Sequence, residues 1–178
     1  MAVVDERLVE DIAEHDRYYR IEDFVTYLER HVHDDEPGVS MGVIHAYADA
    51  LGYERERTAE LLDERLTDSM TWVSDTVFYR MGDSISIYPL SWHERLDGSL
   101  DLADYVRVML KGREAAGEEF PTGERGIPQK DILTALEIFT DIDRKEGEEL
   151  LRKQRQQGDI VIYAYQNPED IVRLPQNG

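Results

Sequence analysis

The chain has 178 residues, of which 41% are hydrophobic and 33% charged, and its formal net charge is -19. This length and apolar content are enough for one domain or two small domains with a buried core, which argues against a disordered chain. Cysteine is absent, so disulfides, thiolate metal sites and cysteine nucleophiles are excluded.

Two targeting features are also not expected. No run of about 20 apolar residues occurs, which predicts that the chain does not span a membrane. The first residues, Met-Ala-Val-Val-Asp-Glu, contain neither a basic region nor a long apolar run, so we expect no signal peptide. The expected location is the cytoplasm.

The first 66 residues predict four helices. Apolar residues recur at helical spacing on both sides of 18–20, which predicts two N-terminal helices. Ser40 is suited to cap a third helix, and Gly52 follows it where a C-terminal glycine is favoured. The same spacing predicts a fourth helix from Glu54 to Leu66.

An extended region is predicted from Met70 onward, because β-branched and aromatic residues replace the helical pattern. Gly82 and Asp83 lie between two strand-like runs, 77–81 and 84–88, which predicts a tight hairpin. Asp101 is suited to cap a further helix.

Residues 112–126, GREAAGEEFPTGERG, contain four glycines and a proline and predict a linker. We therefore expect a helical domain with a hairpin over 1–111 and a C-terminal module over 127–178. In this module, the sequence predicts a helix through Phe139 and a second helix from Asp143 to Gly158. Ile160 and Ile162 should face inward and Tyr163 outward, before a returning strand at 171–174. The predicted class is α+β and helix-rich.

Three segments of this module carry a family resemblance: IPQKDILTALEIF, IDRKEGEELLRKQRQQGDIV and IVRLP. Residues 127–174 resemble the winged-helix modules of archaeal transcription regulators and of the C-termini of replicative minichromosome-maintenance helicases. One departure concerns Gln154, which stands where the family usually has an apolar residue.

The resemblance implies that the helix at 144–157 would enter a DNA major groove and that the hairpin at 160–174 would be the wing. The implied nucleic-acid-binding residues are Arg144, Lys145, Arg152, Lys153 and Arg155, and this helix has a net charge of +2. An alternative interpretation is that these cations only form the solvent face of a helix, where the helix dipole favours basic residues near the C-terminus.

Residues 40–88 are a second candidate winged helix, because two amphipathic helices precede a hairpin there too. Its segment 54–66 has three basic and five acidic residues, and a net charge of -2 would oppose contact with phosphates. Tandem winged helices that bind proteins rather than DNA would also fit this arrangement.

The residue types that carry the charges indicate adaptation to high salt. The cations are 16 arginines and only four lysines, set against 39 acidic residues. This composition resembles that of proteins from salt-in halophilic archaea, where molar salt shortens the Debye length to about 3 Å and screens self-repulsion. The alternative is an acidic mimic of nucleic acid or a cation-binding protein. The charge is uneven: residues 1–120 have a net charge of -16 and residues 121–178 have -3.

Candidates for chemistry are sparse. The densest set of metal-ligand types is His31, His33, Asp34, Asp35 and Glu36, but residues two apart on a helix point in different directions, so we predict no metal and no cofactor.

His93 next to Glu94 is a weak candidate for a general base, and we expect it instead to be a surface histidine at the start of a helix. Neither a phosphate-binding loop nor a nucleophile elbow occurs, so we do not expect an enzyme. Aromatic residues could stack on bases or on a partner, although core packing is their commoner role: Tyr18, Tyr19, Trp72, Phe78, Tyr88 and Trp92.

Our first hypothesis is a winged-helix DNA-binding or regulatory protein of a halophile, with the N-terminal part serving for dimerisation or partner binding. The alternative is a protein–protein interaction module with tandem winged helices and no nucleic acid. A distant third is a metal-dependent enzyme centred on residues 31–36.

Overall fold

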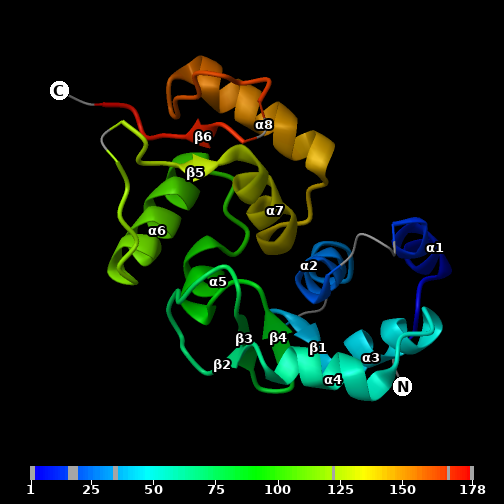
Figure 1. Cartoon of the computed structure of the whole chain (residues 1–178). Helices are drawn as coiled ribbons and strands as arrows, with labels where there is room; N and C mark the ends of the chain where they lie inside the picture. Colours follow the sequence, from blue (N-terminus) through cyan, green and yellow to red (C-terminus); the bar gives the residue numbers. More distant parts are fainter. Residues whose placement is uncertain (1–2, 16–19, 34–35, 122, 168, 177–178) are drawn as a thin grey trace. The chain divides into compact units, whose positions relative to one another are not determined.

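The computed structural model describes residues 3–15, 20–33, 36–121, 123–167 and 169–176. Its internal contacts divide the chain into two compact units, Met1–Leu90 (unit 1) and Ser91–Gly178 (unit 2). Eight helices and two small sheets occur among the described residues, which confirms the predicted helix-rich α+β class (Figure 1). None of the helices in those residues has both the length and the apolar character needed to cross a bilayer.

Unit 1 is built around a mixed four-stranded sheet with the order β1-β4-β3-β2. Antiparallel pairs join Val39 to Ile85 and Tyr79 to Ser86, whereas Leu66 pairs with Phe78 in parallel. The elements are α1 (Glu6–Glu14), α2 (Ile21–His31), β1 (Val39–Ser40), α3 (Met41–Ala50), α4 (Arg55–Asp63), β2 (Leu66–Thr67), β3 (Phe78–Met81) and β4 (Ser84–Ser86).

Local signals explain most of these boundaries. The Ser40 hydroxyl accepts a hydrogen bond from the Val43 amide at 3.2 Å, as expected for an N-cap, and Gly52 has a φ of +77° after the end of α3. The helix predicted to reach Leu66 is too long: α4 ends at Asp63, because Leu66 and Thr67 join the sheet instead.

One carboxyl lies in the interior of unit 1. Glu29 on α2 is 3% exposed, and its oxygens accept hydrogen bonds from the Ser86 hydroxyl at 2.5 Å and the Ile87 amide at 2.9 Å. Burial disfavours the ionised form and raises the pKa of Glu29 to about 7, although both hydrogen bonds act in the opposite direction. The carboxyl therefore ionises with difficulty inside the fold.

Unit 2 contains four helices and a two-stranded antiparallel sheet, in which Ile127 pairs with Val172. A single bridge between Val161 and Arg173 extends this pairing. The elements are α5 (Leu90–Leu96), which begins at the last residue of unit 1, α6 (Leu102–Ala115), β5 (Ile127–Pro128), α7 (Gln129–Phe139), α8 (Arg144–Gln157) and β6 (Ile171–Val172). The predicted cap at Asp101 is confirmed, since its carboxylate accepts from the Ala103 amide at 3.1 Å.

The predicted linker at 112–126 does not separate the two units, which divide at residues 90 and 91. Helix α6 continues to Ala115 and packs against α7 and β5 within unit 2. Ion pairs hold the segment in place: Arg113 contacts Asp131 at 3.4 Å, and Arg125 contacts Glu114 at 2.6 Å. A glycine-rich composition therefore marks a loop within a unit here.

Both units share one order of elements: helix, strand, helix, helix, and then two extended segments. In unit 1 this order runs α2, β1, α3, α4, β3, β4, and β1 pairs antiparallel with β4. In unit 2 it runs α6, β5, α7, α8, the segment around Val161, and β6, and β5 pairs antiparallel with β6 (Figure 1). Unit 1 adds α1 and β2 to this shared arrangement.

Candidate nucleic-acid interface

Helix α8 has the bounds that the sequence predicts. The Asp143 carboxylate accepts a hydrogen bond from the Glu146 amide at 2.8 Å, and Gly158 adopts a left-handed conformation at the other end. Gly147 and Leu151 are its buried residues and face α7. A Cβ on Gly147 would lie 3.0 Å from a Leu133 methyl carbon, so glycine allows the two helices to pack closely.

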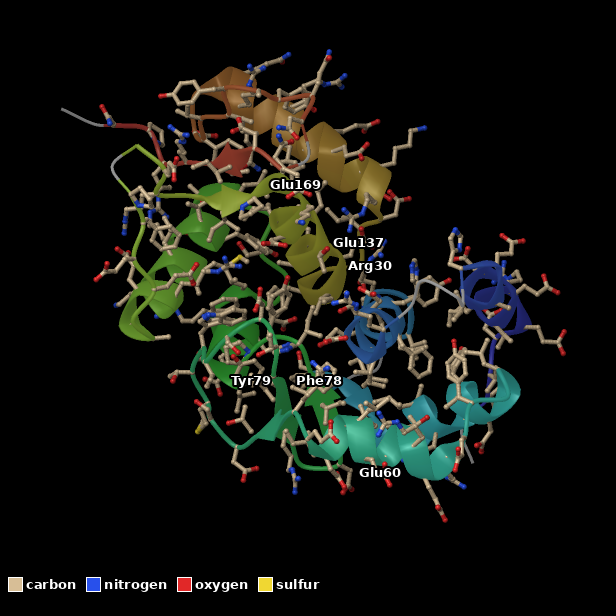
Figure 2. The ribbon with its side chains drawn as sticks, viewed as in Figure 1. Arg30, Glu60, Phe78, Tyr79, Glu137 and Glu169 are labelled. Carbon is tan, nitrogen blue, oxygen red and sulfur yellow. The ribbon has the colours of Figure 1, made fainter. Side chains whose placement is uncertain are left out.

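The opposite face of α8 presents three cations to solvent. Lys145, Arg152 and Lys153 are exposed, and within the described residues none of them forms an ion pair. Helical spacing places Glu148 and Glu149 on the same face. We call these five residues the α8 face. Figure 2 shows several nitrogen-tipped side chains that extend outward from α8.

Arg144, also predicted as a binding residue, is used for packing. Its Nε atom lies 2.7 Å from a carboxylate oxygen of Glu137, which is 3% exposed, and its Nη2 donates to the Thr134 hydroxyl at 3.0 Å. Both partners belong to α7. Arg144 therefore neutralises a buried carboxylate and holds α8 against α7.

Arg155, the last of the predicted residues, lies at the base of the hairpin. Its Nε donates to the Ile162 carbonyl at 3.0 Å, and its guanidinium stands 5.1 Å from the centre of the Tyr165 ring. Across the hairpin, the Arg173 guanidinium lies 4.6 Å from the centre of the Tyr163 ring. Both arginines therefore lie at cation–π distance from a tyrosine ring.

Tyr163, Tyr165 and Arg173 are therefore parts of the candidate interface that the sequence analysis did not include. The alternation at 160–163 does predict the outward position of Tyr163, which is 72% exposed, and the inward position of Ile160 and Ile162. The contact between the Tyr163 ring and the Arg173 guanidinium joins residues ten positions apart, on opposite sides of the hairpin, and no local sequence pattern predicts it.

The structure accounts for the unusual Gln154. Its side-chain oxygen accepts from the Leu102 amide at 2.9 Å, and its side-chain nitrogen donates to the Leu100 carbonyl at 2.7 Å. The amide thus satisfies backbone groups at the beginning of α6, where a helix has no internal partner for its first N–H groups. An apolar residue at this position could not make these two bonds.

We expect Gln154→Leu to destabilise unit 2 by about 1 to 2 kcal/mol, because two backbone groups would lose their partner. Gln156→Leu is the matched control, since Gln156 is exposed on the same helix and the change should be nearly neutral. Urea unfolding followed by Trp92 fluorescence reports on unit 2. Equal losses in the two variants would contradict this role of Gln154.

In unit 1, the corresponding helix α4 offers no comparable cationic face. Its arginines lie beside carboxylates: Arg55 contacts Asp49 at 4.0 Å, and Arg57 contacts Glu60 at 3.2 Å. Glu60 points away from the sheet of the unit (Figure 2). Arg65, just beyond the helix, contacts Glu22 on α2 at 2.5 Å.

The two units also differ in net charge. Unit 1 has 21 acidic and 8 basic residues, a formal charge of -13, whereas unit 2 has 18 and 12, a charge of -6. Residues 144–178 have six acidic and six basic residues and are neutral overall. Within unit 2, the net negative charge therefore lies in residues 91–143 and not in the part that contains α8 and the hairpin.

The structure brings together a set of potential metal ligands that differs from the set predicted at residues 31–36. Among the described residues, Asp11, Glu14 and His15 on the exposed side of α1 have ligand atoms within 4.8 Å of one another. Asp34 and Asp35 lie outside the described residues, and the described members of the 31–36 set do not form such a group.

The other candidates are mostly core residues. His93 is 7% exposed and meets Phe139 edge-to-face at 4.8 Å, so the expectation of a surface histidine is wrong. Trp72, Phe78, Tyr88 and Trp92 are all buried, as core packing would require, and Tyr18 and Tyr19 lie outside the described residues.

A scan against protein-family models and searches of curated proteins and of solved structures find no match to this chain.

Proposed function

We propose that each unit is a winged-helix module and that the chain is a DNA-binding or regulatory protein adapted to high salt, with unit 2 as its DNA-binding part. The shared order of elements supports this proposal, because helix, strand, two helices and a hairpin is the arrangement of a winged helix. In this proposal, α8 (Arg144–Gln157) serves as the recognition helix and residues 160–174 as the wing.

The observation that carries the proposal is the α8 face. Lys145, Arg152 and Lys153 are exposed, while Arg113 and Arg144 in the same unit are held by carboxylates. Among the described residues these three cations form no ion pair, so they are available to contact phosphates. The neutral charge of residues 144–178 lowers the repulsion that a polyanion would meet there.

Unit 1 has a different role in this proposal, which is contact with a protein partner. Arg55 and Arg57 on α4 lie beside carboxylates, as does Arg65 just beyond the helix, and the acidic surface of α4 would repel phosphates. The loop before β3 also exposes two apolar side chains, Met70 at 59% and Val73 at 44%. Exposed apolar groups are favoured in protein contacts and serve no purpose against DNA backbones.

Reversing the charges of the α8 face tests the DNA proposal. We expect the triple variant Lys145→Glu, Arg152→Glu, Lys153→Glu to bind duplex DNA about 30-fold more weakly near 0.3 M KCl, because it loses three phosphate contacts. The slope of log affinity against log salt should fall by about 2 to 3. Fluorescence anisotropy with a labelled mixed-sequence duplex, from 0.3 M to molar KCl, measures both quantities.

A second triple variant controls for net charge. Arg7→Glu, Arg55→Glu, Arg57→Glu changes the charge by the same amount on exposed residues of unit 1, and we expect it to change affinity less than about threefold. Equal weakening by the two variants, or a wild-type chain that does not bind duplex DNA, would contradict the proposal.

A further inference from the structure

A shallow depression of about 610 Å³ lies beside the wing of unit 2. Two tyrosine rings, an arginine and two side-chain amides line it, together with one small residue: Arg155, Tyr163, Ala164, Tyr165, Gln166 and Asn167. We call it the wing depression. Five of these residues are consecutive in the loop between the two extended segments of the hairpin.

The rings of the wing depression are held in position. The Tyr165 hydroxyl donates to the Glu148 carbonyl of α8 at 3.3 Å, and the Arg155 guanidinium covers one side of its ring. The Arg173 guanidinium lies against the Tyr163 ring at 4.6 Å, yet this ring remains 72% exposed. Tyr163 therefore offers an available aromatic surface whose other side is supported by a cation.

The loop itself is fixed by backbone contacts. The Gln129 side chain donates to the Asn167 carbonyl at 2.9 Å, and the Ala164 amide donates to the Asp170 carboxylate at 2.7 Å. Asn167 in turn accepts from the Glu169 amide at 3.0 Å. A site arranged in advance loses little conformational entropy when a ligand binds.

We propose that the wing depression binds an unpaired nucleobase, so that unit 2 engages single-stranded as well as duplex nucleic acid; this rests on the proposed nucleic-acid function of the same unit. A base in a duplex exposes only its edges, whereas an unpaired base exposes the flat surface that an aromatic ring can stack on. The exposed amide of Gln166 can donate to and accept from the edge of a stacked base.

High salt favours this mode of contact. Phosphate contacts weaken as salt rises, because counterion release contributes less. Stacking buries apolar surface, and concentrated salts do not weaken that contribution in the same way. For a chain with the composition of a salt-adapted protein, an aromatic contact can retain affinity under conditions in which the α8 face alone loses it.

The test uses the full chain with a single-stranded oligonucleotide of about 15 nucleotides and a duplex of the same length, both labelled, in 0.5 to 2 M KCl. We expect Tyr163→Ala to weaken single-strand binding about tenfold and to weaken duplex binding by a clearly smaller factor. Tyr163→Phe keeps the ring and should bind like the wild type. A fluorescent base analogue in the single strand should be quenched by the wild type and not by Tyr163→Ala.

The outcomes separate this inference from the proposed function. If the wild type does not bind the single strand, or if Tyr163→Ala binds it as well as the wild type does, the inference is overturned. In that case, loss of duplex binding in the triple variant of the α8 face would leave the proposed function standing. If instead Tyr163→Ala weakens binding to the single strand while the triple variant keeps its affinity for the duplex, the inference is supported and the proposed role of the α8 face is contradicted.

Discussion

Replacing Glu29 by glutamine should make unit 1 more stable above neutral pH. In the unfolded chain the carboxyl ionises near pH 4.5, whereas burial raises its pKa in the folded unit to about 7. The stability that belongs to the protonated carboxyl is therefore complete below pH 4.5 and is lost as the pH rises to 7. By pH 8 the loss is about 3 kcal/mol, because each pKa unit corresponds to about 1.4 kcal/mol.

Glutamine cannot ionise, yet it can keep both contacts of the carboxyl. Its oxygen can accept from the Ile87 amide, and its nitrogen can donate to the Ser86 hydroxyl. We expect Glu29→Gln to match the wild type below about pH 4 and to exceed it by up to about 3 kcal/mol at pH 8. Urea unfolding in constant molar KCl, followed by Trp72 fluorescence, measures the difference at each pH.

The comparison requires an exposed carboxyl as control. Glu60 has 64% of its side chain exposed beside Arg57, and Glu60→Gln should shift stability by less than about 0.5 kcal/mol at every pH tested. If the stability difference between Glu29→Gln and the wild type does not change with pH, the burial of Glu29 does not control its ionisation, and the prediction is wrong.

Adding one methyl group at Gly38 should cost unit 1 about 3 to 4 kcal/mol. Gly38 has a φ of +85°, which costs about 1 kcal/mol or more for any residue with a Cβ. A Cβ there would also lie 2.6 Å from the Ile85 carbonyl oxygen, which belongs to the backbone of β4 and cannot rotate away. The strand pairing of β1 with β4 would have to shift.

A variant of Gly52 distinguishes the cost of the positive φ from the cost of the close contact with Ile85. Its φ of +77° is similar, but no atom lies within 4 Å of the position of a Cβ. We therefore expect Gly52→Ala to cost only about 1 kcal/mol, which is the backbone contribution alone. Urea unfolding followed by Trp72 fluorescence compares the two variants. Losses of the same size would show that the contact with Ile85 is unimportant.

Where a local signal determines an element, the sequence predicted it closely. Asp143 and Gly158 bound α8 because a side chain caps one end and a left-handed glycine terminates the other, and both signals lie within the helix and its immediate neighbours. The caps at Ser40 and Asp101 are equally local. The hairpin of β3 and β4 follows from Gly82 and Asp83.

Elements that depend on distant partners were not predicted. Strand β2 has only two residues and exists because Leu66 meets Phe78, twelve residues later. Helix α5 has only seven residues, and its buried Trp92 and His93 resemble an irregular aromatic segment until their packing partners are known. The segment 112–126 looks like a linker for the same reason, since its residue Arg113 forms an ion pair with Asp131 on α7.

The candidate site shows the same limit at single residues. Arg144 and Lys145 are adjacent cations in the sequence, but Arg144 holds the buried Glu137 and Lys145 is exposed. Only the packing of α7 against α8 separates their roles. Gln154 departs from the winged-helix pattern in the sequence. Its two hydrogen bonds, to the Leu100 carbonyl and the Leu102 amide, span about 50 residues of the chain, so no local pattern reveals them.

Helices α7 and α8 also differ in how freely their sequences can change over evolution. Most positions of α7 are buried, including the polar Gln129 and Glu137, so nearly every substitution there alters the core of unit 2. In α8 only Gly147 and Leu151 are buried. Its outer positions can therefore diverge between descendants of this chain with little loss of stability, and specificity for a new binding partner can evolve there while the scaffold is conserved.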